Sequence, residues 1–193
     1  PEEIATEAED AFFSKDFARA ERLYEEFAKT DPDPEKHGMA LANLGVVRMR
    51  LEKFGAAQQA LTKARAIHPD NAFVHFMLGM SHYWQGQNDD AILALENAAQ
   101  LDPENIKAHQ YIGISSARLG EFKNAEKGFL KAVELDPSFA PAHFNLAVIY
   151  ATGDGGRETY DRAESHYLKA IDSGADRDPL LERMLNEAKA LAG

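Results

Sequence analysis

Apolar residues recur along the chain at the spacing of amphipathic helices, and one segment carries two apolar stripes. When residues 73–86, FVHFMLGMSHYWQG, are placed on a helical wheel, the first stripe contains His75, Leu78, Gly79 and His82. The opposite side carries the larger side chains Phe73, Phe76, Met77, Met80, Tyr83 and Trp84. Packing inside a single hairpin explains only one of these stripes, so the second needs its own explanation.

The pattern repeats with a period of 34 residues, as the spacing of Pro69, Pro103 and Pro137 shows. The recurring columns are Leu44-Gly45, Leu78-Gly79 and Ile112-Gly113; Ala57, Ala91 and Ala125; Leu61, Leu95 and Phe129; and Ala64, Ala98 and Ala132. Small residues let two helices approach closely, and large apolar residues form the stripe that each helix buries. Each unit is therefore predicted to be a hairpin of two helices of roughly 14 residues.

Two outer units extend the pattern, each with a small insertion. Pro32 and Pro69 are 37 residues apart, which predicts a three-residue spacer in DPEKHG, and four extra residues fall within TGDGGRETYD. The predicted repeats cover residues 1–34, 38–71, 72–105, 106–139 and 140–175. They are expected to form one domain over residues 1–193.

These columns resemble those of tetratricopeptide-repeat (TPR) proteins, and the last unit also resembles the Sel1-like variant. The resemblance implies an all-α fold, a right-handed α-solenoid of about five helix hairpins with a C-terminal capping helix. Residues 178–192 are predicted to form that helix, with a partner-binding amphipathic helix as the alternative. Its apolar stripe contains Leu180, Leu181, Met184, Leu185, Ala188 and Leu191.

Glycines are expected to end the first helix of two repeats. Gly86 and Gly120 stand where a left-handed cap is needed, a conformation that glycine adopts without strain. Lys15 and Glu52 occupy this place in the first two repeats. The turns there are expected to form differently or with backbone strain.

Composition narrows the possible partners and compartments. The chain has 21 Lys and Arg against 32 Asp and Glu, a net charge of −11, which disfavours nucleic acid and anionic membrane surfaces. It contains no Cys, so disulfides, thiolate metal sites and a Cys nucleophile are excluded. No apolar run approaches the ~18 residues of a membrane span. A soluble protein is expected, cytoplasmic by default, and an exported compartment stays open if a signal segment was removed before Pro1.

The histidine column suggests packing rather than metal binding. His75, His109 and His143 recur every 34 residues, but neighbouring helices pack ~8–10 Å apart, too far for shared metal ligands. We expect core histidines. The GDGGRE segment at 153–158 lacks the phosphate-loop and calcium-loop spacings and is expected to be a turn in which Gly supplies positive φ. The sequence also contains no recognisable motif for nucleophilic catalysis. We therefore expect no bound metal, no cofactor and no enzymatic activity.

The second stripe of residues 73–86 matches positions that, in TPR proteins, line a concave peptide-binding groove. Met39 and Asn43 occupy such positions in repeat two. Adaptable Met and large aromatic side chains suit peptide recognition. The alternative is that the stripe is buried between adjacent first helices. The candidate peptide-binding residues are Phe73, Met77, Met80, Tyr83, Trp84, Asn43, Tyr111, Ile114, Arg118 and Asn145.

The residues at the carboxylate-clamp positions of some TPR domains indicate a different ligand here. Ala5, Glu9, Phe73 and Met77 stand at clamp positions, and only Asn43 matches the clamp pattern. The sequence therefore predicts an interaction scaffold for an apolar or amphipathic peptide. A structural element that self-associates through stacked repeats is the alternative.

Overall fold

Every element in the described residues of the computed structural model is an α-helix, as the repeat pattern predicts. The structure describes residues 2–30, 33–153 and 156–192, which form two compact units, residues 1–103 and 104–193. The first unit contains α1 (Glu2–Phe13), α2 (Phe17–Thr30), α3 (Pro34–Arg50), α4 (Phe54–Ile67), α5 (Ala72–Trp84) and α6 (Asn88–Leu101). The second contains α7 (Ile106–Arg118), α8 (Phe122–Leu135), α9 (Ala140–Thr152), α10 (Gly156–Asp172) and α11 (Pro179–Ala192).

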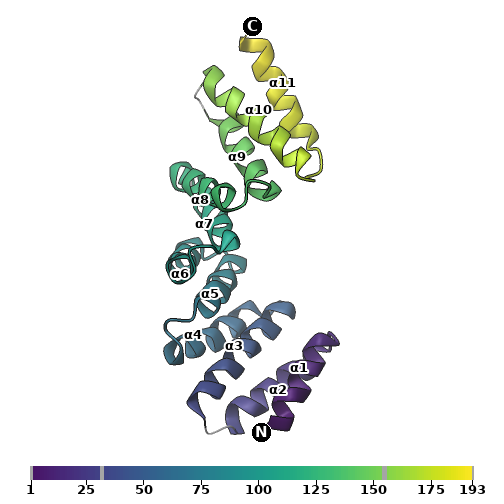
Figure 1. Cartoon of the computed structure of the whole chain (residues 1–193), viewed down its shortest axis with the longest axis vertical. Helices are drawn as coiled ribbons and strands as arrows, with labels where there is room; N and C mark the ends of the chain where they lie inside the picture. The colour runs from purple at the N-terminus through teal and green to yellow at the C-terminus, as the bar shows by residue number, and fades with distance from the viewer. Residues whose placement is uncertain (1, 31–32, 154–155, 193) are drawn as a thin grey trace. The chain divides into compact units, whose positions relative to one another are not determined.

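Consecutive helices pair into hairpins, which confirms the predicted all-α fold of stacked helix pairs (Figure 1). The small-residue columns lie where the two helices of a hairpin meet. A Cβ atom on Gly79 of α5 would lie 2.6 Å from Leu95 Cγ of α6, so only glycine fits at this approach. The single domain over residues 1–193 stays a prediction.

The turns within the hairpins share one capping geometry. In the α5–α6 turn, the Gln87 N–H donates to the His82 carbonyl at 3.0 Å and the Gly86 N–H donates to the Tyr83 carbonyl at 3.0 Å. These are the two bonds of a Schellman cap, and Gly86 has the positive φ of 74° that this cap requires. Gly120 has the same role in the second unit, with φ of 78°.

Lys15 and Glu52 adopt this left-handed conformation although neither is glycine. Their φ angles are 63° and 57°, and both turns form the same pair of cap bonds. Of the two expected outcomes, the structure shows strain rather than a different turn, because a Cβ atom in this region lies too close to the following carbonyl.

The predicted spacer before the second repeat is helical rather than a loop. Pro34 begins α3, and the Asp33 side chain accepts a hydrogen bond from the Glu35 N–H at 3.0 Å. A capping Asp followed by Pro at the first helical position is a strong start signal, so the inserted residues add a turn to the helix. This extra turn carries Glu35 and Lys36 to the face of α3 that is described below.

In the second unit, α11 packs on α9 and α10 as a capping helix should. Leu181 and Leu185 are buried in the same apolar cluster as Phe129 and Leu146. Leu180 is exposed, contrary to the predicted stripe, because it lies on the solvent side of the first turn of α11. Ala188 and Leu191, also in that stripe, lie outside the described side chains.

The segment between α9 and α10 differs in part from the expected glycine turn. Gly153 has an extended conformation with φ of −82°, and Gly156 begins α10, so neither supplies the positive φ. Residues 154–155 lie outside the described residues. In the part of the chain that the structure describes, no helix is both long and apolar enough to cross a membrane.

The strained turn at Glu52 predicts a stabilising substitution. Glu52→Gly should raise the free energy of unfolding by about 1 kcal/mol, because glycine adopts the left-handed conformation without the Cβ clash. Urea unfolding of the two proteins measures the difference. Gly86→Ala is the matched control and should lower stability by a similar amount, and a destabilising Glu52→Gly would show that the turn is not strained.

Candidate functional site

The predicted stripe on α5 is exposed only at its ends. Phe73 and Trp84 are 48% and 51% exposed, whereas Met80 and Tyr83 are each only 8% exposed. Met77 is partly buried against the cluster that contains Leu61 and Leu78.

The second stripe is therefore not continuously accessible. Helix α5 contacts α3, α4 and α6, so much of its circumference is covered. A role of Met80 and Tyr83 in peptide binding stays a prediction, but both side chains offer little surface to a partner.

Trp84 is held in an aromatic cluster rather than standing free. Its ring stacks on Phe54 of α4 with a centroid distance of 5.9 Å and an interplanar angle of 14°. Tyr83 meets the same ring edge-on at 5.2 Å. Next to them, the Gln85 side-chain amide donates to the Gln58 Oε1 at 3.0 Å. The stacked rings of Trp84 and Phe54 thus pack the end of α5 against the start of α4.

A hollow of about 520 Å³ lies on the face of α1 and α3. Asn43 lines this hollow together with Met39, a large apolar side chain that is 43% exposed. Tyr24 lies beneath them and hydrogen-bonds Asn43; burial and the nearby Glu9 carboxylate raise the pKa of its hydroxyl to about 12. The complete lining is Ala5, Thr6, Glu9, Tyr24, Phe27, Glu35, Lys36, Met39, Ala40 and Asn43.

Two rows of equivalent positions connect this hollow to α5, because α3 and α5 are neighbours. Met39 and Phe73 are 34 residues apart and form the first row. Asn43 and Met77 form the second row at the same spacing. The exposed apolar surface therefore continues from the hollow along the first helices of repeats two and three.

The remaining predicted residues lie on α7 and α9 in the second unit. Tyr111 and Asn145 occupy equivalent positions on these two neighbouring helices, and both are partly buried. The Asn145 side chain donates to the Pro141 carbonyl at 2.7 Å, and Ile114 packs against the apolar cluster of its unit. Arg118 is exposed. Each unit thus presents its own part of the predicted surface.

Thr6, Tyr24 and Lys36 belong to the hollow but were not predicted from the sequence. Thr6 and Tyr24 come from repeat one, where the columns are weakest. Lys36 lies in the extra turn of α3, whose start signal, Asp33 followed by Pro34, is visible in the sequence.

The expectation of core histidines is confirmed at His75 and His143, whereas His109 is only partly buried. His75 and His143 are buried, with Nε2 atoms 2.7 Å from the Pro69 carbonyl and 3.0 Å from the Pro137 carbonyl. Among the residues that the structure describes, no three His, Cys, Asp or Glu side chains are grouped to hold a metal ion.

His143 also contacts His166 of α10, with 2.8 Å between the two Nδ1 atoms. Because His143 Nε2 must donate to the Pro137 carbonyl, its Nδ1 accepts and His166 Nδ1 donates. Burial, and after it the neighbouring His143, lowers the pKa of His166 to about 4. His166 is thus uncharged at neutral pH.

A charged cluster lies beside this histidine pair. The Tyr150 hydroxyl donates to Glu126 Oε1 at 2.5 Å, and Arg162 pairs with the same oxygen at 2.8 Å. The Arg162 guanidinium lies 3.9 Å from the centroid of the Tyr150 ring. These contacts join α8, α9 and α10 and form no arrangement of nucleophile and base.

Family models described as tetratricopeptide repeat match most of the chain. One matches residues 72–105, and a second matches residues 6–72 and 112–178. No curated protein sequence matches the chain.

Solved structures with the same fold include MamA and YrrB. MamA from Desulfovibrio magneticus RS-1, residue 41 to its end, has a TM-score of 0.79 at 19% identity and covers 94% of each chain. Another MamA structure has a TM-score of 0.78 at 23% identity, covering 86% of this chain and 93% of that one. YrrB is described as a TPR protein with an unusual peptide-binding site. It has a TM-score of 0.73 at 24% identity, and the match covers 95% of this chain and 88% of that one.

The His143–His166 pair predicts a loss of stability on mild acidification. The folded state holds the pKa of His166 at about 4, below the usual 6.5, so only the unfolded state takes up this proton between those values. The free energy of unfolding should therefore fall as the pH is lowered through this window, by on the order of 2 kcal/mol. Urea unfolding at a series of pH values measures the loss.

The matched variants isolate the pair from other titrating groups. His166→Gln keeps a donor toward His143 but cannot titrate, and it should remove most of the loss. His82→Gln, a histidine of the first unit, should retain it. An unchanged loss in His166→Gln would exclude the pair as its source.

Proposed function

Because the chain belongs to the tetratricopeptide-repeat family, we propose that it is a non-catalytic interaction scaffold that binds an apolar or amphipathic peptide segment. The peptide lies on the first helices of the hairpins, across α1, α3 and α5. The observation that carries this proposal is the hollow of about 520 Å³ between α1 and α3, with Met39 and Phe73 exposed along its continuation.

The chemistry of this face suits a segment with spaced apolar side chains. Met39 adapts its shape to different partners, and Phe73 supplies a large flat contact. Two such exposed side chains at equivalent positions on neighbouring helices offer successive contacts to one segment.

Polar groups in the hollow fix the orientation of the bound segment. The Asn43 amide can both donate to and accept from a peptide backbone, and the Tyr24 hydroxyl holds it in place. Glu9 and Glu35 outnumber Lys36 in the lining, so the segment carries basic rather than acidic side chains beside its apolar ones.

YrrB supports a peptide ligand for this fold, since that protein is described as having a peptide-binding site. A second candidate function is self-association through stacked repeats. Two large exposed apolar side chains favour it, Phe13 at the end of α1 and Leu180 on α11.

A displayed library of short random peptides tests the binding face. Peptides selected on the wild-type chain should lose affinity at least about tenfold with Met39→Glu/Phe73→Glu, measured by fluorescence anisotropy, because charge replaces both apolar contacts. Peptides that bind this variant with unchanged affinity would refute the proposed face.

Leu93→Glu is the matched control, because Leu93 is 62% exposed on α6, a second helix. It should change the affinity by less than about twofold. Circular dichroism checks that both variants keep their helicity. Light scattering on the same samples tests the second candidate, which a protein that stays monomeric at all concentrations excludes.

A further inference from the structure

The hollow of about 520 Å³ on α1 and α3 carries two carboxylates that have no cationic partner. Glu9 belongs to α1 and Glu35 to the extra turn of α3, and both residues are exposed. In the part of the chain that the structure describes, neither carboxylate forms an ion pair or accepts a hydrogen bond. Lys36 also lines the hollow, so the lining has two carboxylates against one ammonium group.

Helix α1 makes the electrostatic potential at this hollow more negative. Its sequence, EEIATEAEDAFF, has five acidic residues and no Lys or Arg. Arg19 of α2 pairs with one of them, Glu7, at 2.8 Å. Burial, and after it the Glu9 carboxylate, raises the pKa of Tyr24 to about 12, so the charge of Glu9 acts beneath the hollow as well. A cationic ligand group is therefore favoured here.

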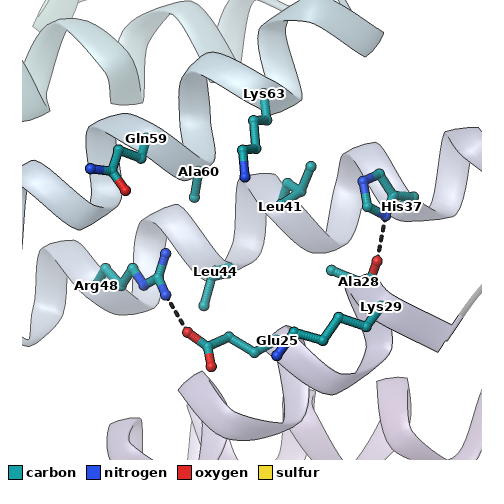
Figure 2. A pocket seen from close by; sticks show the side chains of 10 residues that line it. All are labelled: Glu25, Ala28, Lys29, His37, Leu41, Leu44, Arg48, Gln59, Ala60 and Lys63. Carbon is teal, nitrogen blue, oxygen red and sulfur yellow. Dashed lines mark hydrogen bonds and ion pairs between the residues drawn. The ribbon is translucent and has the colours of Figure 1, made fainter.

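A second hollow of the same unit, of about 260 Å³, differs in this respect. It is lined by residues of α2, α3 and α4 and shares none of them with the hollow on α1 and α3. Its carboxylate, Glu25, pairs with Arg48 (Figure 2). Lys29 and Lys63 add further positive charge to the lining. A cation is thus favoured at the hollow on α1 and α3 and not at this one.

The groups around the first hollow suit a guanidinium ion better than an ammonium ion. A guanidinium has five donors in one plane and serves several acceptors at once, whereas an ammonium is a compact point charge. Glu9, Glu35 and Asn43 supply acceptor oxygens from two helices. Met39 is 43% exposed and offers apolar surface to the methylene stem of an arginine. The volume lies within the ~300–1,000 Å³ of typical ligand pockets, so a whole arginine side chain fits.

We propose that the hollow on α1 and α3 is an anchor site for an arginine side chain of the bound peptide. This inference rests on the proposed function, because it assigns one side chain of the same segment. The guanidinium pairs with Glu9 and Glu35, and the stem of the arginine lies along Met39.

The spacing of the first helices sets the distance from the arginine to the next contact of the segment. Helices α3 and α5 are neighbours, and neighbouring helices pack ~8–10 Å apart. An extended chain spans ~10 Å in three residues. An apolar residue three positions from the arginine therefore reaches Phe73, which is 48% exposed on α5.

Fluorescence anisotropy on peptides selected with the full wild-type chain tests the arginine. The selected peptides should share an arginine three positions from an apolar residue. Replacing this arginine by citrulline, which has nearly the same shape but no charge, should weaken binding at least about tenfold. Replacement by lysine should give a smaller loss, because it keeps the charge but not the planar donors.

Matched variants of the chain separate this site from general charge effects. Glu9→Gln/Glu35→Gln should weaken the arginine peptide at least about tenfold. The same variant should change the affinity of the citrulline peptide by less than about twofold, because both changes remove the same ion pairs. Glu26→Gln/Glu96→Gln removes two exposed carboxylates of the first unit that line neither hollow. This control should change the affinity of the arginine peptide by less than about twofold.

Two results overturn the anchor site: equal affinities of the arginine and citrulline peptides, or wild-type affinity of the arginine peptide for Glu9→Gln/Glu35→Gln. Phe73→Glu lies outside the hollow and distinguishes this failure from failure of the proposed function. Binding lost in Phe73→Glu but kept in the glutamate-pair variant refutes the anchor and retains the peptide face. Binding kept in both variants refutes the two proposals together.

N-acetylarginine amide, titrated alone, distinguishes a peptide from a small molecule as the source of the guanidinium. It should bind at least about tenfold more weakly than the arginine peptide, because it has no contact with Phe73. Equal binding would assign the hollow to a free guanidinium compound and overturn the peptide anchor.

Discussion

The fold depends on the close approach of the two helices within each hairpin. A Cβ atom added to Gly45, Gly79 or Gly113 would lie 2.5 Å from Leu61, 2.6 Å from Leu95 or 2.7 Å from Phe129. At these separations the large residue of the second helix fills the space that the missing side chain leaves. Every repeat that keeps this column therefore buries its own apolar stripe inside the hairpin.

The same approach determines which surfaces remain for partners. The apolar stripe that recurs in every repeat is covered within the hairpin. Only the rest of the surface of the first helix can therefore contact solvent or a ligand. In the first unit that remainder includes Met39, Asn43 and Phe73, beside the hollow on α1 and α3. A second hollow lies beside α3 and is lined by residues of α2, α3 and α4. Both hollows thus lie beside α3, and the preceding hairpin of α1 and α2 contributes to the lining of each.

The sequence predicts the hairpins well because their constraint is local and periodic. A glycine every 34 residues, opposite a large apolar residue, specifies the pairing of adjacent helices, and the buried His75 and His143 recur with the same period of 34 residues. The binding face is harder to predict. A helical wheel treats α5 alone, whereas α3, α4 and α6 all pack on it and cover Met80 and Tyr83.

The most direct test of the close approach is the stability of Gly128→Ala compared with Gly55→Ala. Replacing Gly by Ala in an exposed helix stabilises the protein by up to ~1 kcal/mol. A Cβ atom on Gly55 of α4 would meet nothing nearer than 3.5 Å, so Gly55→Ala should raise the free energy of unfolding. A Cβ on Gly128 of α8 would lie 2.8 Å from the Gly113 backbone nitrogen of α7, so Gly128→Ala should lower the free energy of unfolding by roughly 1–3 kcal/mol. Urea unfolding measures both changes. Equal stabilisation by the two substitutions would contradict the account, because it would show that the helices can separate without loss.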